Sequence, residues 1–363
     1  MLRPIYVKEA WEIVSRYRIE PKVKEIPIEE AVYRVLAEDI YADADLPRFN
    51  RSAMDGIAIR SDDSRGISVS KREKISTGMP LPPRADAVVP RENYIIKGSE
   101  AILDRPYHKR ENVDVKGSDV SEGELILRRG SLIKPNHLPA LALSRERVKV
   151  YTIEFSLIVV GSEIEPFGEV RDLNSPTLKT LISLYGGEVS EIIRVPDDER
   201  KIEEAIRKAK GVIVTTGGTS IGERDLVPRV IERLGEVLVH GIKAKPCKPF
   251  TFSFIGKPIF SLPGPPVACF IAADVFLGPR IKLNLGLEPE RIRERRRGIL
   301  AKPIASKPDR RDYVRVIYRE GKLYPAGSGA GRISTLFKAD GYMEIEEDLE
   351  GIDAGEEVER LRF

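Results

Sequence analysis

The segment GGTSIGERD, residues 217–225, has the composition of a loop that holds an anion. Gly217 and Gly218 allow backbone N–H groups to turn toward a ligand, and Thr219 and Ser220 add hydroxyl donors. A helix is predicted to follow, and it would present its positively polarised N-terminal end. The loop matches neither a P-loop nor a dinucleotide-binding fingerprint, so a tight turn without a ligand stays an alternative.

Carboxylates gather at the ends of the same predicted strands. Glu163 follows one strand, Asp197 and Asp198 follow a second, and Asp225 ends the glycine-rich loop. Acids repel an anion unless a cation bridges them, and hard oxygen ligands suit Mg²⁺. The pattern therefore predicts a magnesium-assisted phosphate site, with helix N-capping as the alternative for the three aspartates.

A basic segment follows a later predicted strand. Lys243, Lys245 and Lys248 lie within six residues and are stiffened by Pro246 and Pro249. Three ammonium groups on a stiff backbone predict a clamp for an anion. A solvated basic turn is the alternative.

Residues 50–56, NRSAMDG, combine small, polar and acidic side chains without a hydrophobic period. Loops of this kind carry function more often than packing, although a capped turn would use the same residues. Residues 262–266, LPGPP, form another irregular turn after an apolar strand. Both segments are candidate parts of a site.

The elements that must position these loops lie between residues 155 and 285. Apolar runs such as FSLIVVG and GVIVTT predict strands buried on both faces. They alternate with helical segments expected at residues 175–186, 197–210, 225–234 and 267–277. This order predicts an open, mostly parallel α/β sheet, whose ligands bind beyond the carboxyl ends of the strands.

The remainder of the chain has a different pattern. Amphipathic helices are expected at residues 5–17 and 28–36, and short apolar runs predict a β-rich region over residues 57–135. A loop and helix are expected near residues 131–144, followed by a strand. The alternating, glycine-rich tail, residues 299–363, predicts a small β-barrel or sandwich.

Composition excludes several classes of protein. The 363 residues carry 60 Lys and Arg against 57 Asp and Glu, so a polybasic nucleic-acid binder is disfavoured, and the run at residues 291–297 is expected to be a solvated linker. No apolar stretch reaches membrane-spanning length, and two cysteines give no disulfide framework. Without a signal-peptide pattern, a cytoplasmic location is expected. High charge and the absence of glutamine predict a thermophilic source.

Taken together, the motifs resemble one family. In order, the chain contains SAMDG at residues 52–56, TGxPLPxxADAVV at 77–89, ENVxxxGxD at 111–119, GGTSIGxxD at 217–225, KPxKPF at 245–250 and LPGxPV at 262–267. This series resembles the molybdopterin molybdenumtransferases, the MoeA and gephyrin E-domain family. The resemblance covers essentially the whole chain.

The resemblance implies a multidomain α/β plus β fold in four parts. An N-terminal helical and extended domain, residues 1–50 and 119–153, would be interrupted by a β-rich domain, residues 51–118. An α/β pterin-binding domain would span residues 154–287, and a β-barrel would span residues 288–363. The protein is expected to be a homodimer whose cleft lies between the α/β domain of one protomer and the N-terminal and C-terminal parts of the other.

The implied reaction inserts molybdate into adenylylated molybdopterin, releasing AMP, with Mg²⁺ as cofactor. Tungstate is an alternative oxyanion, and a molybdopterin adenylyltransferase is the expected functional partner. The expected catalytic residues are Asp55, Thr77, Asp119, Glu163 and Asp225, with metal ligands among Asp197, Asp198 and Asp225. The expected substrate-binding residues are Ser52, Gly217, Gly218, Thr219, Ser220, Lys245, Lys248, Pro263, Pro266 and Ser328.

Three departures from the family pattern leave alternatives open. Pro265 stands where the family has asparagine, residues 109–111 replace a Gly-Glu pair, and Cys247 replaces glycine. Cys247 is either a reactive thiol or a small buried filler. A non-catalytic scaffold of the same fold, or a molybdopterin adenylyltransferase built on a similar α/β domain, are the competing functions.

Overall fold

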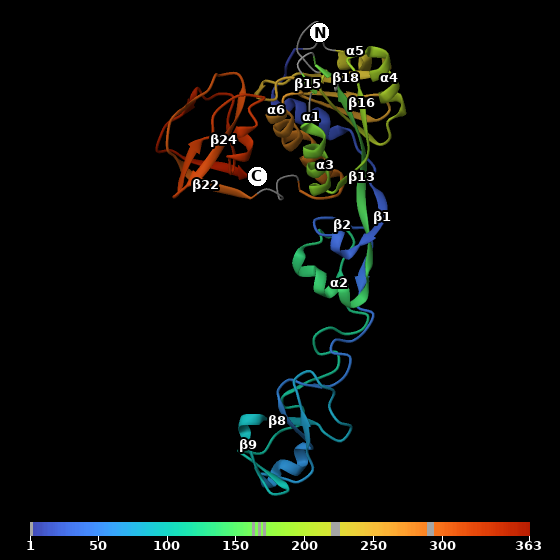
Figure 1. Ribbon diagram of the computed structural model, residues 1–363, viewed down its shortest axis with the longest axis vertical. Helices are drawn as coiled ribbons and strands as arrows, with labels where there is room; N and C mark the ends of the chain where they lie inside the picture. The colour runs from blue at the N-terminus through green and yellow to red at the C-terminus, as the bar shows by residue number, and fades with distance from the viewer. Residues whose placement is uncertain (1–2, 162–163, 166–167, 170–171, 219–225, 289–293) are drawn as a thin grey trace. The chain divides into compact units, whose positions relative to one another are not determined.

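The computed structural model describes residues 3–161, 164–165, 168–169, 172–218, 226–288 and 294–363 (Figure 1). The chain divides into two compact units. The first contains residues 1–24, 33–35 and 149–363, and the second contains residues 25–32 and 36–148. The four-part division expected from the sequence stays a prediction.

The first unit is built on the predicted α/β sheet. Four strands run parallel in the order β16 (Gly187–Val195), β13 (Arg147–Val160), β17 (Val212–Thr216) and β21 (Pro258–Leu262). The antiparallel strand β20 (Thr251–Phe254) pairs with β21, and β18 (Glu236–His240) pairs with β20. All five side chains of β17 and of β21 are buried, as expected for strands covered on both faces.

Helices cover both faces of this sheet. The helices α4 (Glu199–Lys208) and α5 (Leu226–Leu234) pack their apolar residues onto one face. On the other face lie α3 (Asn174–Leu184) and α6 (Pro266–Ala272), which continues through a π-helical turn, Ala273–Leu277, into α7 (Gly278–Asn284) (Figure 1). The apolar helix predicted over residues 267–277 is therefore longer and contains a π-helical turn.

A closed barrel ends the chain, as the alternating pattern predicts. Its five strands are β24 (Arg311–Arg319), β25 (Lys322–Pro325), β22 (Arg295–Leu300), β28 (Glu357–Arg362) and β26 (Gly341–Ile345), with β26 pairing back onto β24. A short helix, α8 (Ser334–Phe337), lies between β25 and β26. The barrel core contains buried aliphatic side chains such as Val316 and Leu323.

The second unit is β-rich, as predicted. Its three-stranded sheets are β7-β5-β8 and β6-β10-β9, and its two-stranded ladders are β11-β4 and β12-β3. The bounds are β3 (Ile40–Tyr41), β4 (Arg51–Ser52), β5 (Gly56–Ile59), β6 (Ser68–Val69), β7 (Glu73–Ile75), β8 (Ala87–Pro90), β9 (Tyr94–Lys97), β10 (Glu100–Leu103), β11 (Val113–Asp114) and β12 (Leu125–Leu127). The helix α2 (Leu138–Ser144) lies where the loop-and-helix pattern predicts it.

The prediction of a helix at residues 28–36 is wrong. The structure has the strand β1 (Lys22–Pro27), a single 3₁₀ turn over Ile28–Glu30, and then β2 (Val35–Leu36). Tyr33 has a φ of +64°, which is incompatible with a right-handed helix and interrupts the segment. The first predicted helix is confirmed as α1 (Val7–Arg16).

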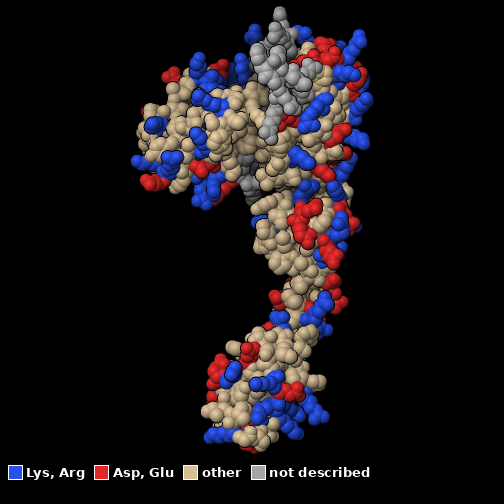
Figure 2. All heavy atoms as spheres, in the orientation of Figure 1, with Lys and Arg blue, Asp and Glu red and all other residues tan. Residues whose placement is uncertain are grey.

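Surface composition agrees with the near balance of charge. Figure 2 shows Lys and Arg side chains interspersed with Asp and Glu over the drawn face. None of the helices in the described residues combines the length and apolar composition needed to cross a membrane.

We expect Phe250→Ala to destabilise the first unit. Phe250 is fully buried, and its ring stacks on Phe276 with 4.0 Å between centroids. Loss of the ring should lower the free energy of unfolding by about 3–5 kcal/mol. Urea unfolding followed by the fluorescence of Trp11, the single tryptophan, measures this unit. The control Phe337→Ala, at a side chain that is 73% exposed, should change stability by less than about 0.5 kcal/mol; equal effects would contradict the packing described here.

Candidate functional site

A cavity lies at the point where the sheet reverses its strand order. The chain passes from β13 to β16 on one side, and then to β17 on the other side of β13. Such switch points are the usual ligand sites of open α/β sheets. The cavity, of about 250 Å³, is lined by residues 159–161, 172–174, 216–217, Gly264 and Pro266. We call it the switch-point cavity.

Asn174 joins three of the loops that form this cavity. Its side-chain amide donates to the hydroxyl of Thr216 and to the carbonyl of Gly264, both at 2.7 Å. The ends of β17 and β21 are thereby tied to the start of α3. From the sequence, Asn174 is placed in the first loop at this edge but has no predicted role, and Thr216 is missed, because its only signal is a polar residue at the end of an apolar strand.

Asp172 stands beside Asn174 at the wall of the cavity. It accepts a hydrogen bond from the Ser175 backbone N–H at 2.9 Å and forms an ion pair with Arg194 at 2.9 Å. Partial burial alone would raise the pKa of Asp172, but these contacts outweigh it and lower the pKa. The carboxylate therefore stays ionised, and it is held by Ser175 and Arg194.

The glycine-rich loop begins where the sequence predicts it. Gly217 and Gly218 follow β17 with φ values of +83° and +63°. A Cβ on Gly217 would come 2.2 Å from the Val160 carbonyl oxygen, so only glycine fits against the end of β13. Thr219, Ser220, Asp225 and Glu163 lie outside the described residues.

The two consecutive aspartates have different surroundings. Asp198 is the N-cap of α4 and accepts the Lys201 backbone N–H at 2.9 Å, so the capping alternative holds for this residue. A Cβ on Gly161 would lie 3.0 Å from an Asp197 carboxylate oxygen, so that carboxylate lies beside Gly161, which lines the switch-point cavity. Among the described residues, no group of three potential metal ligands converges.

The predicted basic clamp lies on a segment held by backbone hydrogen bonds from two sides. Ile5 accepts the Lys243 N–H at 2.8 Å, and the Lys243 carbonyl accepts the Arg311 N–H at 2.9 Å. The strand β19 (Ala244–Lys245) runs parallel to β24 of the barrel.

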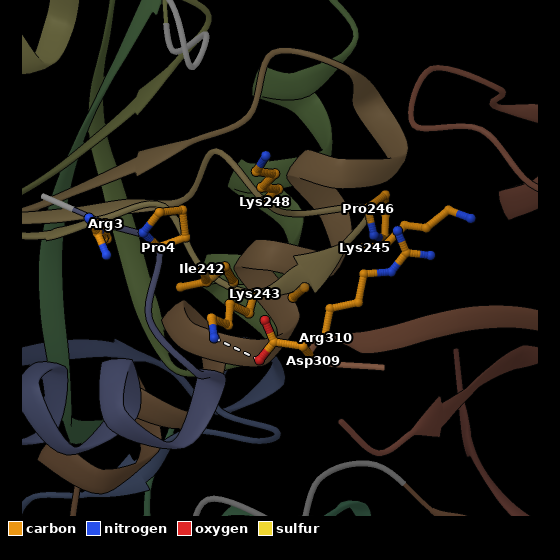
Figure 3. A pocket seen from close by; sticks show the side chains of 10 residues that line it. Arg3, Pro4, Ile242, Lys243, Lys245, Pro246, Lys248, Asp309 and Arg310 are labelled. Atoms are coloured by element: carbon orange, nitrogen blue, oxygen red, sulfur yellow. Dashed lines mark hydrogen bonds and ion pairs between the residues drawn. The ribbon is translucent and has the colours of Figure 1, made fainter. Parts of the chain in front are cut away.

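This segment lines a cavity of about 500 Å³, which we call the lysine cavity (Figure 3). Its charged lining residues are Arg3, Lys243, Lys245, Lys248, Asp309 and Arg310.

The cations of the lysine cavity fall into two groups. Lys243 pairs with Asp309 at 2.7 Å, and Arg310 forms two contacts with Asp312 at 2.8 and 3.0 Å. Lys245 and Lys248 are exposed and have no ion-pair partner among the described residues. Figure 3 shows their side chains pointing away from the Lys243–Asp309 pair. Arg3 is also exposed and has no ion-pair partner among the described residues, so Arg3, Lys245 and Lys248 are the cations available to an anion.

Cys247 is a buried filler rather than a reactive thiol. It is fully buried between the two lysines, and burial raises its pKa to about 12. Cys269, in α6, is equally buried, with its pKa also raised to about 12 by burial. Both thiols stay protonated at neutral pH, so neither is an effective nucleophile.

The loop that carries Ser328 docks on the first turn of α6. The Ala330 carbonyl accepts the backbone N–H groups of Val267 and Ala268 at 2.9 and 3.3 Å. Ser328 is therefore held near the α/β domain of its own chain, although the resemblance assigned the C-terminal part to the partner protomer. The next N–H, of Cys269, bonds the Pro265 carbonyl at 2.9 Å, so the proline is accommodated without an unsatisfied donor.

A second set of predicted residues lies in the second unit. Asp55 accepts two hydrogen bonds from Thr77, from the backbone N–H at 2.7 Å and from the hydroxyl at 3.0 Å. The backbone bond, followed by the hydroxyl bond, lowers the pKa of Asp55. The loop at residues 111–119 joins them, since the Lys116 N–H donates to the Asn50 side chain at 2.9 Å. Asp119, which ends that loop, is exposed.

Ser52 is a correction to the expected substrate-binding set. It is fully buried, and its hydroxyl donates to the Met54 carbonyl. Its role is to shape the turn that presents Asp55, because a hydroxyl buried inside its own loop offers no contact to a ligand.

Comparisons with known proteins cover the whole chain. Residues 5–144 match the MoeA N-terminal region (domain I and II), residues 156–283 match a "probable molybdopterin binding domain", and residues 297–363 match the MoeA C-terminal region (domain IV). A molybdopterin biosynthesis protein of Methanocaldococcus jannaschii is 35% identical, over 97% of this chain and 95% of its own length. A molybdopterin molybdenumtransferase of Staphylococcus epidermidis is 30% identical, over 78% and 76%.

The crystal structure of a molybdopterin biosynthesis MoeA protein from Pyrococcus horikoshii superimposes with a TM-score of 0.80. It is 31% identical, and the match covers 99% of both chains. A molybdenum cofactor biosynthesis protein from Pyrococcus furiosus, 23% identical with a TM-score of 0.63, shares the fold.

Thr77→Val is expected to raise the pKa of Asp55 toward that of an exposed aspartate. Because the pKa is depressed by Thr77, stability from this contact is present above the unfolded-state pKa and is lost as pH falls through the folded value. Carboxyl-detected NMR titration measures the shift. Thr77→Ser keeps the hydroxyl and serves as the control; an unchanged pKa in Thr77→Val would show that the backbone N–H alone sets it.

Asp198→Ala is expected to destabilise the protein by about 1 kcal/mol without weakening Mg²⁺ binding, because the residue caps α4. Denaturant unfolding and isothermal titration with MgCl₂ measure the two effects. Asp197→Asn, the matched control, should leave stability unchanged. A loss of Mg²⁺ affinity in Asp198→Ala at unchanged stability would instead restore Asp198 as a metal ligand.

Proposed function

Because this chain belongs to the MoeA family, we propose that it is a molybdopterin molybdenumtransferase, which inserts molybdenum into molybdopterin during cofactor biosynthesis. The observation that carries this conclusion is the match of all three family regions, in order, to one chain. The switch-point cavity lies inside the region that matches the molybdopterin binding model, residues 156–283.

The proposed substrates are adenylylated molybdopterin and molybdate or tungstate, with AMP as a product. The pterin would enter the switch-point cavity, where Asn174 and Thr216 fix the loops and Gly217 lets the backbone approach the ligand. Pro266 lines the opposite wall of the cavity, and Pro263 would help to shape that wall. Stiff residues such as these prolines would keep the cavity open for a planar ring system.

The proposed oxyanion site is the lysine cavity. Lys245 and Lys248 have no ion-pair partner among the described residues, so their charges are available to a tetrahedral dianion. Ser328 is proposed to add a hydroxyl contact to the substrate on the side of the switch-point cavity, because its loop docks on the first turn of α6. Ammonium groups beside an oxyanion stabilise the negative charge on its oxygens during the transfer.

Asp55, Thr77 and Asp119 are proposed to act from the second protomer of a homodimer. Thr77 holds Asp55 ionised, so Asp55 is suited to orient the water that hydrolyses the phosphoanhydride. A molybdopterin adenylyltransferase as supplier of the substrate, and a cytoplasmic location, belong to the same proposal.

Magnesium is the proposed cofactor, with Asp197 and Asp225 as the candidate ligands. Asp198 is committed to capping α4 and does not fit that role. The described residues thus contribute one carboxylate, from Asp197, which is too few to hold the ion on their own. Glu163 is proposed to act beside it at the phosphates.

The test is AMP release from adenylylated molybdopterin with Mg²⁺ and either molybdate or tungstate. Lys245→Ala and Lys248→Ala should each lower the rate about tenfold or more, because each removes a charged hydrogen-bond donor. Lys302→Ala, at an exposed barrel residue outside the lysine cavity, is the control and should keep the wild-type rate. A folded protein that releases no AMP with either oxyanion would favour the non-catalytic scaffold.

A further inference from the structure

The lysine cavity contains a carboxylate where an anion is expected to bind. Of its described lining residues, five are cationic and one, Asp309, is acidic. An acid in such a place weakens the attraction that the cavity has for an oxyanion. The attraction of an oxyanion alone therefore does not explain why a carboxylate lies in this cavity.

Asp309 is held in a defined position. It has a φ of +68° in the turn before β24, and its backbone N–H donates to the Glu347 carbonyl at 2.8 Å. Its carboxylate accepts hydrogen bonds from Lys243, at 2.7 Å, and from the hydroxyl of Tyr6. The hydrogen bond from Lys243, followed by that from Tyr6, lowers the pKa of Asp309, so the carboxylate is ionised at neutral pH.

Lys243 is in turn fully engaged by its neighbours. Its ammonium group bonds Asp309 and also lies 4.0 Å from the centroid of the Tyr6 ring. The hydrogen bond to Asp309 raises the pKa of Lys243, which stays charged but is directed away from the cavity's other lysines (Figure 3). The cavity thus has Lys245 and Lys248 ready for an anion and one ammonium group, from Lys243, that is withheld.

We propose that Asp309 limits the oxyanion affinity of the lysine cavity by holding Lys243 in an internal ion pair. This inference rests on the proposed function, in which the cavity takes a molybdate or tungstate dianion. An oxyanion that is a substrate must leave the cavity when it is transferred, so binding it too tightly in the ground state slows turnover. Asp309 therefore keeps the affinity of the cavity for the oxyanion moderate.

The expected effect of removing this carboxylate follows from Coulomb's law. A unit negative charge about 10 Å from a dianion, in a solvent-exposed site, changes its affinity about fourfold. Release of the Lys243 ammonium adds to this, so Asp309→Asn should bind molybdate about five to ten times more tightly at low salt. The gain should shrink at high ionic strength.

The experiment is isothermal titration of the purified full-length protein with sodium molybdate and, separately, sodium tungstate. Asp309→Asn should bind both more tightly, and Lys243→Ala added to Asp309→Asn should remove most of the gain. Asp353→Asn, which removes an exposed carboxylate outside the cavity, is the charge-matched control and should bind as the wild type does. Unchanged or weaker binding by a folded Asp309→Asn would overturn the inference.

The single variant Lys243→Ala keeps the test decisive if Asp309→Asn does not fold. We expect Lys243→Ala to weaken binding about fourfold, because it leaves the nearby charge of Asp309 uncompensated, and we expect adding Asp309→Asn to restore the wild-type affinity. A loss that Asp309→Asn does not restore would show that Lys243 binds the oxyanion directly, and the inference would fail. If Lys245→Ala and Lys248→Ala bind as the wild type does, the proposed oxyanion site itself is wrong.

Discussion

The backbone hydrogen bonds of residues 241–245 are the constraint on which the first unit depends. This segment bonds Ile5 along one edge and the start of β24 along the other, so it connects the N-terminal segment, the α/β sheet and the barrel. It also bonds its own continuation, because the Ile242 N–H donates to the Lys248 carbonyl at 2.9 Å. Lys245 and Lys248 are placed by this ladder alone, whereas Lys243 is also held by the contacts of its side chain with Asp309 and Tyr6. Because this backbone is already fixed, binding of the proposed anion has to order only the lysine side chains.

The two cavities of the first unit are held in different ways. The switch-point cavity is shaped by hydrogen bonds and by close packing. Asn174 joins three loops by hydrogen bonds, and Gly217 packs against Val160 where a Cβ would clash. The lysine cavity is organised by charge, since its ion pairs decide which cations stay available. The proposed function assigns the pterin to the first cavity and the oxyanion to the second.

Sequence reasoning succeeded where a local pattern had one structural solution. Apolar runs alternating with amphipathic helices gave the doubly wound sheet, and period-two alternation gave the barrel. It failed at residues 28–36, where helical spacing of apolar residues was outweighed by the left-handed conformation at Tyr33. Ser52 was expected to bind substrate because it belongs to a functional motif, whereas its hydroxyl is used within the turn. The role of Asn174 in joining the loops was not predicted, because nothing local indicates partners that lie 42 and 90 residues away.

The sequence by itself determined the fold class and the family, because these depend on residue type and on spacing along the chain. Only the tertiary structure decided how the candidate site residues are used. It showed that Asp198 caps a helix, that Cys247 is buried, and that Lys243 and Arg310 are neutralised while Lys245 and Lys248 have no ion-pair partner among the described residues. The physical reason is that pairing and burial are set by neighbours far away in the chain, and a charge acts on a ligand only if no such neighbour has already compensated it.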